Sequence, residues 1–286
     1  MMKKLRIAIL VFFVAVAAVF TYTLVKRRMT VDYNPPIITA DEDVLHVSVT
    51  ASDEELLKGV TARDNIDGDV TDTLVVTSRS KFFAKGRLHV NYAAFDGNKN
   101  VGTASREVVY TDYVSPRFHL YEPLRYASGT SGNDYLEHIT AEDCIDGNIT
   151  QQIKISFGNT TVVSSEATQQ KINIQVTNSG GDTSVLELTA SMEEYLLFSK
   201  ASPALKEYIA YVPLGDTINL RSYIVGIWSA GSVRSFSDTR YTISNVSVDQ
   251  STLDRNTPGV YTVVYQLTGL EGEELGKAEL IVVVEE

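Results

Sequence analysis

Aspartates gather in two short stretches of this sequence, and their spacing is suited to binding a hard cation. Asp64, Asp67 and Asp69 fall within six residues, and Asp143 and Asp146 repeat the three-residue spacing of the first pair. Carboxylate oxygens are the ligands that Ca²⁺ prefers in proteins. These stretches are therefore candidate calcium-binding loops.

The same aspartates also fit ordinary turn chemistry, which is the interpretation that we favour. Asp and Asn side chains accept hydrogen bonds from the backbone of tight turns, and Gly68 and Gly147 supply the positive φ that such turns need. An EF-hand is excluded, because its third and twelfth positions would be Ile66 and Val75. We therefore expect no resident cofactor, with Ca²⁺ as the one alternative.

The elements around these loops are predicted to be β-strands. Apolar and polar residues alternate with a period of two over 45–50, 88–93 and 260–267, and Gly-, Asn- and Asp-rich turns separate these runs. Almost no helical pattern occurs after residue 30. Short strands with turns at this spacing predict an all-β chain of antiparallel sandwiches.

An internal repeat divides the chain into modules. Val60 to Thr71 recurs 79 residues later as Ile139 to Thr150, and Gly259 to Tyr265 matches Gly86 to Tyr92. Each module opens with a proline near an apolar residue, where a strand can begin without donating to a ladder. The predicted modules are 31–113, 114–196 and a divergent 197–286, behind a segment formed by residues 1–30.

The first module resembles a known family. Gly59 to Thr71 (GVTARDNIDGDVT), followed by Gly86, Tyr92 and the turn that begins at Asp96, resembles the bacterial immunoglobulin-like surface repeats described as pesticidal-crystal-protein-like Ig domains. The second module keeps the Asp-Gly loop, and the third keeps the later strand. The resemblance implies tandem immunoglobulin-like β-sandwiches on secreted or membrane-anchored bacterial proteins, without implying a reaction.

An immunoglobulin-like topology also predicts which loops meet. The loop after the second strand and the hairpin before the last strand lie at the same end of such a sandwich. We therefore expect the Asp64 loop to approach the turn at Asp96. The candidate metal ligands are Asp64, Asp67, Asp69, Asp96, Asp143 and Asp146.

The N-terminus carries a membrane-spanning pattern. Ile7 to Val25 holds 19 residues without a charge, which as a helix spans about 30 Å, the thickness of a bilayer core. Basic residues flank both ends. We expect an uncleaved anchor, and the alternative is a signal peptide cleaved after Ala15-Val16-Ala17. Both place the C-terminal part outside the cytoplasm.

Charge and cysteine usage exclude several classes of protein. Residues 31–286 carry 19 basic against 36 acidic residues, which argues against nucleic-acid binding because that needs a basic face. The single cysteine excludes a disulfide framework within the monomer and any multi-cysteine metal site.

Catalytic motifs are scarce, so we do not expect an enzyme. Ser78 to Lys81 fits S-x-x-K, but that motif needs the start of a helix and a later K-T-G, and neither is present. His46, His89, His119 and His138 show no metal-ligand spacing and are expected to be half-exposed strand residues.

These observations predict a single-pass membrane protein with a non-catalytic role at the cell surface, as a spacer, in adhesion or in protein interaction. The alternative is an accessory protein that binds polysaccharide or serves envelope biogenesis, with or without Ca²⁺. Tyr208, Tyr211, Tyr223 and Trp228 are the best candidates for an aromatic sugar platform, although we favour core packing for them.

Overall fold

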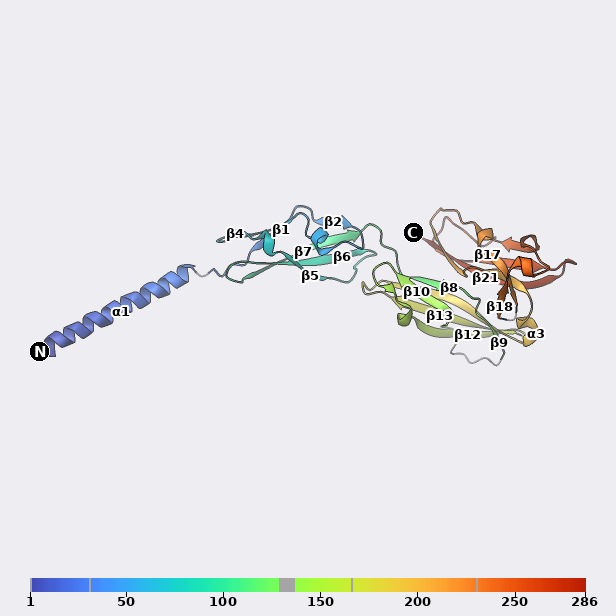
Figure 1. Ribbon diagram of the computed structural model, residues 1–286, viewed down its shortest axis with the longest axis horizontal. Helices are drawn as coiled ribbons and strands as arrows, with labels where there is room; N and C mark the ends of the chain where they lie inside the picture. The colour runs from blue at the N-terminus through green and yellow to red at the C-terminus, as the bar shows by residue number, and fades with distance from the viewer. Residues whose placement is uncertain (1, 31, 129–136, 166, 230) are drawn as a thin grey trace. The chain divides into compact units, whose positions relative to one another are not determined.

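The computed structural model describes residues 2–30, 32–128, 137–165, 167–229 and 231–286, and these divide into two compact units, Met1–Tyr113 and Val114–Glu286. The first unit begins with one continuous helix, α1 (Met2–Thr30), drawn in dark blue in Figure 1. Its stretch Lys4–Lys26 has a mean hydropathy of 2.6, and none of it is buried. It is long and apolar enough to cross a membrane, as the sequence predicts.

The rest of the first unit is a two-layer β-sandwich. One sheet has the strand order β1-β3-β4, and the other has the order β2-β7-β6-β5 with β2 parallel to β7. We call this arrangement of seven strands the first copy. Its elements are β1 (Ile37–Ala40), β2 (Val44–Val47), helix α2 (Asp53–Leu56), β3 (Val60–Asp64), β4 (Gly68–Asp69), the 3-10 helix η1 (Thr71–Thr73), β5 (Val75–Arg79), β6 (Arg87–Phe95) and β7 (Val101–Tyr110).

Alternation of side chains along the strands builds the core of the first copy. On β3, Val60, Ala62 and Asp64 are buried while the residues between them are exposed. Leu88, Val90 and Tyr92 of β6 are fully buried from the other sheet. The two sheets thus pack through their apolar faces, and the inward alternation carries Asp64 into the interior.

The second unit repeats the same arrangement twice among its described residues. The second copy has sheets β8-β10-β11 and β9-β14-β13-β12, with β9 parallel to β14. Its elements are β8 (Arg117–Leu120), β9 (Arg125–Ala127), β10 (Ile139–Asp143), β11 (Gly147–Asn148), the 3-10 helix η3 (Thr150–Gln152), β12 (Lys154–Ser164), β13 (Ala167–Thr177) and β14 (Thr183–Glu193).

The third copy follows after a short helix and keeps this topology although it lacks the Asp-Gly loop. Its sheets are β15-β17-β18 and β16-β21-β20-β19, with β16 parallel to β21. Its elements are α3 (Tyr195–Phe198), β15 (Ser202–Leu205), β16 (Ile209–Pro213), η4 (Leu220–Tyr223), β17 (Ile224–Ser229), β18 (Ser232–Arg234), η5 (Phe236–Asp238), η6 (Ile243–Asn245), β19 (Val246–Asp249), β20 (Gly259–Thr268) and β21 (Glu274–Glu285).

The prediction of an all-β chain of sandwiches behind one N-terminal helix is confirmed. The second and third copies share one continuous apolar core, which includes Phe118 from β8, Ile172 from β13 and Ile209 from β16. The first copy has a core of its own. The division of residues 114–286 into two domains, 114–196 and 197–286, stays a prediction.

Candidate functional site

The two loops that the sequence predicts to meet lie together in the first copy. The loop after β3 contacts the turn after β6, because Asp67 Oδ2 accepts a hydrogen bond of 2.7 Å from the backbone N–H of Gly97. This contact brings the end of β3, at Asp64, next to Asp96, which is the first residue after β6.

Three carboxylates converge at this point, and one of them comes from the segment between α1 and β1. Asp32, Asp64 and Asp96 are all buried, and an oxygen from each lies within 4.8 Å of an oxygen of the other two. Each side chain is less than a tenth exposed. We call these three residues the Asp32 cluster.

Hydrogen bonds from nearby amides hold each carboxylate of the Asp32 cluster. Asp64 Oδ2 accepts from the backbone N–H groups of Ile66 and Asp67 at 2.6 and 2.8 Å. Asp32 Oδ1 accepts from the backbone and side-chain amides of Asn34.

Asn100 holds the third carboxylate and joins it to the Asp32 backbone. Its backbone N–H and its side-chain Nδ2 donate to the two oxygens of Asp96, at 2.7 and 2.6 Å. The same Nδ2 also donates to the carbonyl of Asp32. The three carboxylates are therefore positioned by turn chemistry.

Two oxygens of the Asp32 cluster accept no hydrogen bond. Asp32 Oδ2 and Asp64 Oδ1 are buried and have no hydrogen-bond donor. Among the residues that the structure describes, no lysine, arginine or histidine forms an ion pair with any of the three carboxylates. Unpaired like charges at this separation repel one another, and buried acceptors without donors carry a desolvation cost.

Backbone hydrogen bonds keep Asp64 anionic. The N–H groups of Asp67 and Ile66 lower the pKa of its carboxyl below the ordinary value, against the opposing effect of burial. The cluster therefore presents a charged oxygen ligand at neutral pH.

The second copy has the same loops with a different side chain at one position. Asp143 Oδ1 accepts from the N–H groups of Ile145 and Asp146, as Asp64 does from its own loop. The first residue after β13 is Asn178 rather than an aspartate, and its Nδ2 donates to Asp143 Oδ2 at 3.1 Å. Both oxygens of Asp143 therefore have donors.

The aspartate that matches Asp32 in the repeat is Asp112, and its hydrogen-bond donors lie in the first unit. Asp32 stands four residues ahead of Pro36, and Asp112 stands four residues ahead of Pro116. Within the first unit, Asp112 accepts from the Ser48 hydroxyl at 2.6 Å and from the Val49 N–H at 2.8 Å. Its two oxygens are thus both hydrogen-bonded.

Close backbone packing holds the segment that carries Asp32. Gly102, the second residue of β7, has no room for a side chain, because a Cβ there would lie 1.9 Å from the carbonyl oxygen of Pro36. The second copy has Ser184 at this place in β14, and the Ser184 hydroxyl donates to the Pro116 carbonyl at 2.6 Å. Glycine lets the strand and the Asp32 segment approach directly.

The other predicted ligands take part in turns. Asp69 accepts from the backbone N–H of Thr71, and hydrogen bonds with Thr71 lower its pKa. Asp146 accepts from both the N–H and the hydroxyl of Ser179. Asp67, Asp69 and Asp146 are exposed and form the turn hydrogen bonds that turn chemistry predicts.

Sequence reasoning missed Asp32, although a signal for it was present. The pattern Asp-Tyr-x-x-Pro begins at Asp32 and again at Asp112, just ahead of the first strand of a copy. The prolines mark where the modules begin, and the aspartates four residues before them carry the signal for the cluster.

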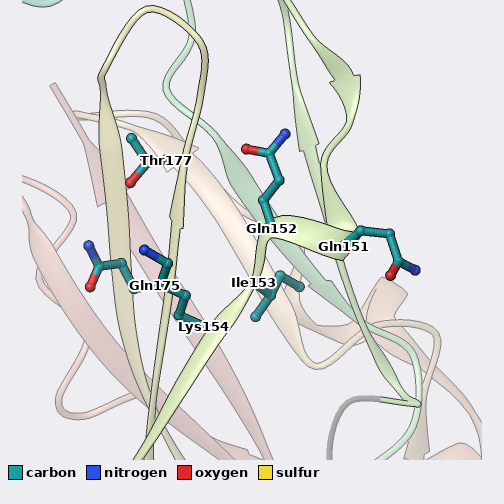
Figure 2. A pocket seen from close by; sticks show the side chains of 6 residues that line it. All are labelled: Gln151, Gln152, Ile153, Lys154, Gln175 and Thr177. Carbon is teal, nitrogen blue, oxygen red and sulfur yellow. The ribbon is translucent and has the colours of Figure 1, made fainter.

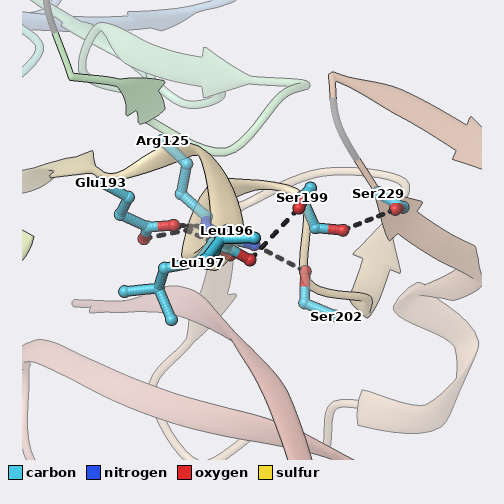
Figure 3. Close-up of polar contacts among 7 residues, drawn as sticks. All are labelled: Arg125, Glu193, Leu196, Leu197, Ser199, Ser202 and Ser229. Carbon is cyan, nitrogen blue, oxygen red and sulfur yellow. Dashed lines mark hydrogen bonds and ion pairs between the residues drawn. The ribbon is translucent and has the colours of Figure 1, made fainter. Parts of the chain in front are cut away.

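A second polar cluster links the second and third copies (Figure 3). The guanidinium of Arg125 in β9 binds both carboxylate oxygens of Glu193 in β14, and it also donates to the Ser202 hydroxyl in β15. The Arg125 and Glu193 side chains are 14% and 10% exposed. This nearly buried two-point ion pair fixes the orientation of the α3 junction.

Contacts between β8 and the third copy extend this joint. The backbone N–H of Tyr208 donates to the Leu120 carbonyl, and the N–H of Phe118 donates to the Tyr211 hydroxyl at 2.7 Å. His119 Nδ1 lies 2.7 Å from the carboxylate of Glu207.

The aromatic residues considered for a sugar platform do not form an exposed row. Tyr208 and Trp228 are buried, as core packing predicts. Tyr211 lies in the joint, and the Tyr223 ring is covered on one face by the Lys206 ammonium. These four rings therefore contact other parts of the protein and do not form a platform for a sugar.

A pocket of about 370 Å³, lined by five residues with polar side chains and by Ile153, lies on the second copy beside η3 and the start of β12. Figure 2 shows Thr177, Gln175 and Lys154 on one side of it, with Gln152 between the strands and Gln151 extending away from the others. Glutamine amides can both donate and accept hydrogen bonds.

The serine of the S-x-x-K motif and the four histidines lie in strands and turns. Ser78 is part of β5 rather than the start of a helix, and it accepts from the Asn91 side chain. His119 and His138 face carboxylates of Glu207 and Glu122.

Comparisons with known proteins give distant likenesses. No protein-family model matches the chain. An uncharacterized 81.3 kDa protein of Acholeplasma phage L2 is 22% identical over 263 residues, which is 87% of this chain and 32% of the phage protein. The chain thus spans about a third of the length of that relative.

Solved structures with some likeness include the CBM51-2 and INT domains of Clostridium perfringens ZmpB, in complex with GlcNAc, and human CDH23 EC21-23. The first is 18% identical over 53% of this chain and 26% of its own, with a TM-score of 0.22. The second is 13% identical over 87% of this chain and all of its own, with a TM-score of 0.20.

Proposed function

We propose that this chain is a single-pass membrane protein whose β-sandwiches lie outside the cytoplasm and do non-catalytic work, as a spacer that carries an adhesive or protein-binding surface. We place it with the bacterial immunoglobulin-like surface repeats. The observation that carries the proposal is one exposed apolar helix followed by three copies of the same seven-strand arrangement.

The membrane assignment rests on α1. A helix with every described side chain exposed to solvent is costly unless lipid surrounds it. Lys3, Lys4 and Arg6 precede its apolar stretch, and Lys26, Arg27 and Arg28 follow it, as at the two faces of a bilayer. The acidic sandwiches would then repel one another and stay soluble at the surface.

The spacer role rests on the joint in the second unit. Sandwiches linked by flexible loops would bend freely, whereas the shared core and the Arg125–Glu193 pair hold the second and third copies together. Breaking a buried ion pair on one side leaves an uncompensated charge. Such a joint suits a protein that must hold its terminal surface at a set distance.

Polysaccharide binding is the second candidate, and the pocket on the second copy favours it. Its amide and hydroxyl groups resemble those that orient sugars by paired hydrogen bonds. A glycan array with the full chain in detergent micelles separates the two functions, since a spacer should retain no glycan. If a glycan binds, Gln152→Ala and Gln175→Ala should reduce the signal, while Gln250→Ala, at an exposed glutamine outside the pocket, is the matched control.

Protease treatment of intact cells tests the topology. With tags at both ends of the full chain, proteinase K should remove the C-terminal tag and leave the N-terminal tag until the cells are lysed. Protection of the C-terminal tag in permeabilised envelopes would contradict the proposal. The intact mass of the recovered protein shows whether residues 1–17 are retained, as an uncleaved anchor requires.

A further inference from the structure

The two unpartnered oxygens of the Asp32 cluster point to a missing ligand. Buried polar atoms in native proteins almost always have a hydrogen-bond partner. Asp32 Oδ2 and Asp64 Oδ1 have none, and they belong to residues whose other oxygens already accept from backbone amides. Turn chemistry therefore accounts for one oxygen of Asp32 and one of Asp64 and leaves the other free for a cation, while both oxygens of Asp96 accept from Asn100 and keep further lone pairs.

We propose that Asp32, Asp64 and Asp96 bind one Ca²⁺ ion in the first copy. Ca²⁺ is held by oxygen ligands at about 2.3 to 2.6 Å, so two ligands on one ion are at most about 5 Å apart. The oxygens of this cluster lie within 4.8 Å of one another and meet that limit. The ion neutralises the buried charges and gives the unpartnered oxygens a partner.

Calcium fits this site better than magnesium. Mg²⁺ requires nearly ideal octahedral geometry at about 2.0 to 2.1 Å, whereas Ca²⁺ accepts irregular sets of carboxylates and waters. The three carboxylates come from a segment, a strand end and a turn whose positions are set by amide hydrogen bonds. A set of carboxylates held in place by these hydrogen bonds is better suited to the larger ion, whose coordination geometry is the more flexible.

The ion would connect the membrane helix to the sandwich. Asp32 lies two residues after the end of α1, outside both sheets, while Asp64 ends β3 in one sheet and Asp96 directly follows β6 of the other. Binding therefore fixes the segment that leaves the membrane to the body of the first copy. This goes beyond the proposed surface role and does not depend on it.

The second copy supplies a natural control for the site. At the position of Asp96 it has Asn178, whose amide donates to Asp143 and occupies the oxygen that a cation would use. The backbone of the two turns is the same, because Asp96 and Asn178 each accept from the backbone N–H four residues later. With a carboxylate at this position, the first copy keeps an Asp64 oxygen that can bind a cation. With an amide there, the second copy has a hydrogen-bond donor for both oxygens of Asp143.

Calorimetric titration of the full chain in detergent micelles tests the assignment, with CaCl₂ and MgCl₂ as the probes. We expect one Ca²⁺ per chain, with a dissociation constant of about 0.1 to 1 mM, the range of extracellular calcium modules. Asp96→Asn and Asp32→Asn should each weaken binding at least about tenfold, because affinity follows the number of charged ligands. Asp143→Asn should leave it unchanged.

Three results would overturn the proposal. One is the absence of calcium heat in a folded chain, and another is a loss of binding in Asp143→Asn as large as in Asp96→Asn. The third is equal affinity for Mg²⁺, which would remove the calcium assignment. We expect the Asp32→Asn variant to fold, because residue 32 lies outside the sheets and asparagine retains the Oδ1 that accepts from Asn34. A loss of calcium binding in this variant therefore reports on the site rather than on misfolding.

Discussion

The first and second copies build the same pair of turns from nearly the same residues and finish them differently. In the first copy, Asp64 meets two other carboxylates and keeps an oxygen without a donor. In the second, Asp143 meets the amide of Asn178, and all its acceptors are satisfied. Two differences therefore separate an electrostatically incomplete turn from a self-contained one: Asn178 replaces Asp96, and the aspartate that matches Asp32 is hydrogen-bonded to Ser48 and Val49 instead.

The comparison shows that the Asp-Gly loop forms the same turn in both copies, with or without a candidate metal site beside it. Its leading aspartate accepts two backbone N–H groups in both copies, and its fourth residue, Asp67 or Asp146, reaches the opposite turn in both. What differs is the environment contributed by the other segments. The loop motif alone therefore does not indicate a metal site. The residues that face the loop determine whether its aspartate is free to bind a cation.

The largest expected effect comes from giving the first copy the residue that the second uses. Gly102→Ser places a Cβ where the Pro36 carbonyl lies, so the segment that carries Asp32 must move away from β7. We expect a loss of about 3 kcal/mol in the stability of the first unit, at the upper end for overpacking, together with weaker Ca²⁺ binding. Amide exchange of the β6 and β7 peptides measures the loss.

The matched change in the second copy should be milder. Ser184→Ala removes one hydrogen bond to Pro116 without steric overlap, so about 1 kcal/mol is expected. Equal losses at the two positions would show that the close approach at Gly102 is not special to the first copy.

The next effect should change sign with calcium. Without divalent ions, Asp32→Asn removes one of three crowded carboxylates, keeps the Oδ1 that accepts from Asn34, and puts an amide donor in place of the unpartnered Oδ2, so the first unit should gain about 1 kcal/mol. With saturating Ca²⁺ the same variant should be less stable than the parent. Urea unfolding with and without chelator, followed by amide exchange, checks this reversal.

Asp143→Asn should show no such reversal. It sets two amides against each other at Asn178 and should cost the second unit about 1 kcal/mol with or without calcium. The fluorescence of Trp228, the one tryptophan of the chain, follows the second unit. A calcium-dependent effect here would place a cation in the second copy as well.

An effect of comparable size distinguishes the first and third copies from the second. Tyr92 and Tyr265 donate buried hydroxyls to the carbonyls of Leu56 and Leu220, and the matching residue of β13 is Ile174. Burial raises the pKa of both tyrosines, which keeps them protonated donors. Tyr92→Phe and Tyr265→Phe should each cost about 1 to 2 kcal/mol, measured by urea unfolding, while Ile174→Val should cost less than either.

The smallest effect concerns pH and the joint of the second unit. The hydrogen bond to Glu207 raises the pKa of His119 above 6.5, against burial and with help from the charge of Glu142, while Arg117 opposes it. The stabilisation is therefore complete below pH 6.5 and is lost as the pH rises through the raised pKa. Because the pair is partly solvated, we expect at most about 1 kcal/mol.

Trp228 fluorescence during thermal unfolding between about pH 6 and pH 8 measures this effect. The parent should lose stability relative to His119→Gln as the pH rises. Parallel curves for the two proteins would show that the pair contributes no pH dependence.

The strand pattern and the repeat were sufficient to predict the β-sandwiches. Alternation is a local property, so Leu88, Val90 and Tyr92 indicate a half-buried strand without knowledge of their partners. The meeting of the Asp64 loop and the Asp96 turn was also predictable, since it follows from topology.

The composition of the cluster was not predicted, for a physical reason. Asp32 lies in a segment without periodicity, and it reaches the cluster because Gly102 admits the Pro36 backbone against β7. The joint of the second unit was missed as well, since Arg125 and Glu193 are 68 residues apart and look like ordinary surface charges in the sequence. Contacts between distant segments depend on packing that composition does not encode.

Hydrogen–deuterium exchange of the full chain with and without Ca²⁺ tests the central difference most directly, because it reads both turns in one experiment. The account predicts slower exchange over residues 32–38 and 95–101 when Ca²⁺ is added, and no change over residues 177–183. Unchanged exchange in the first two segments, or equal protection in the third, would contradict it.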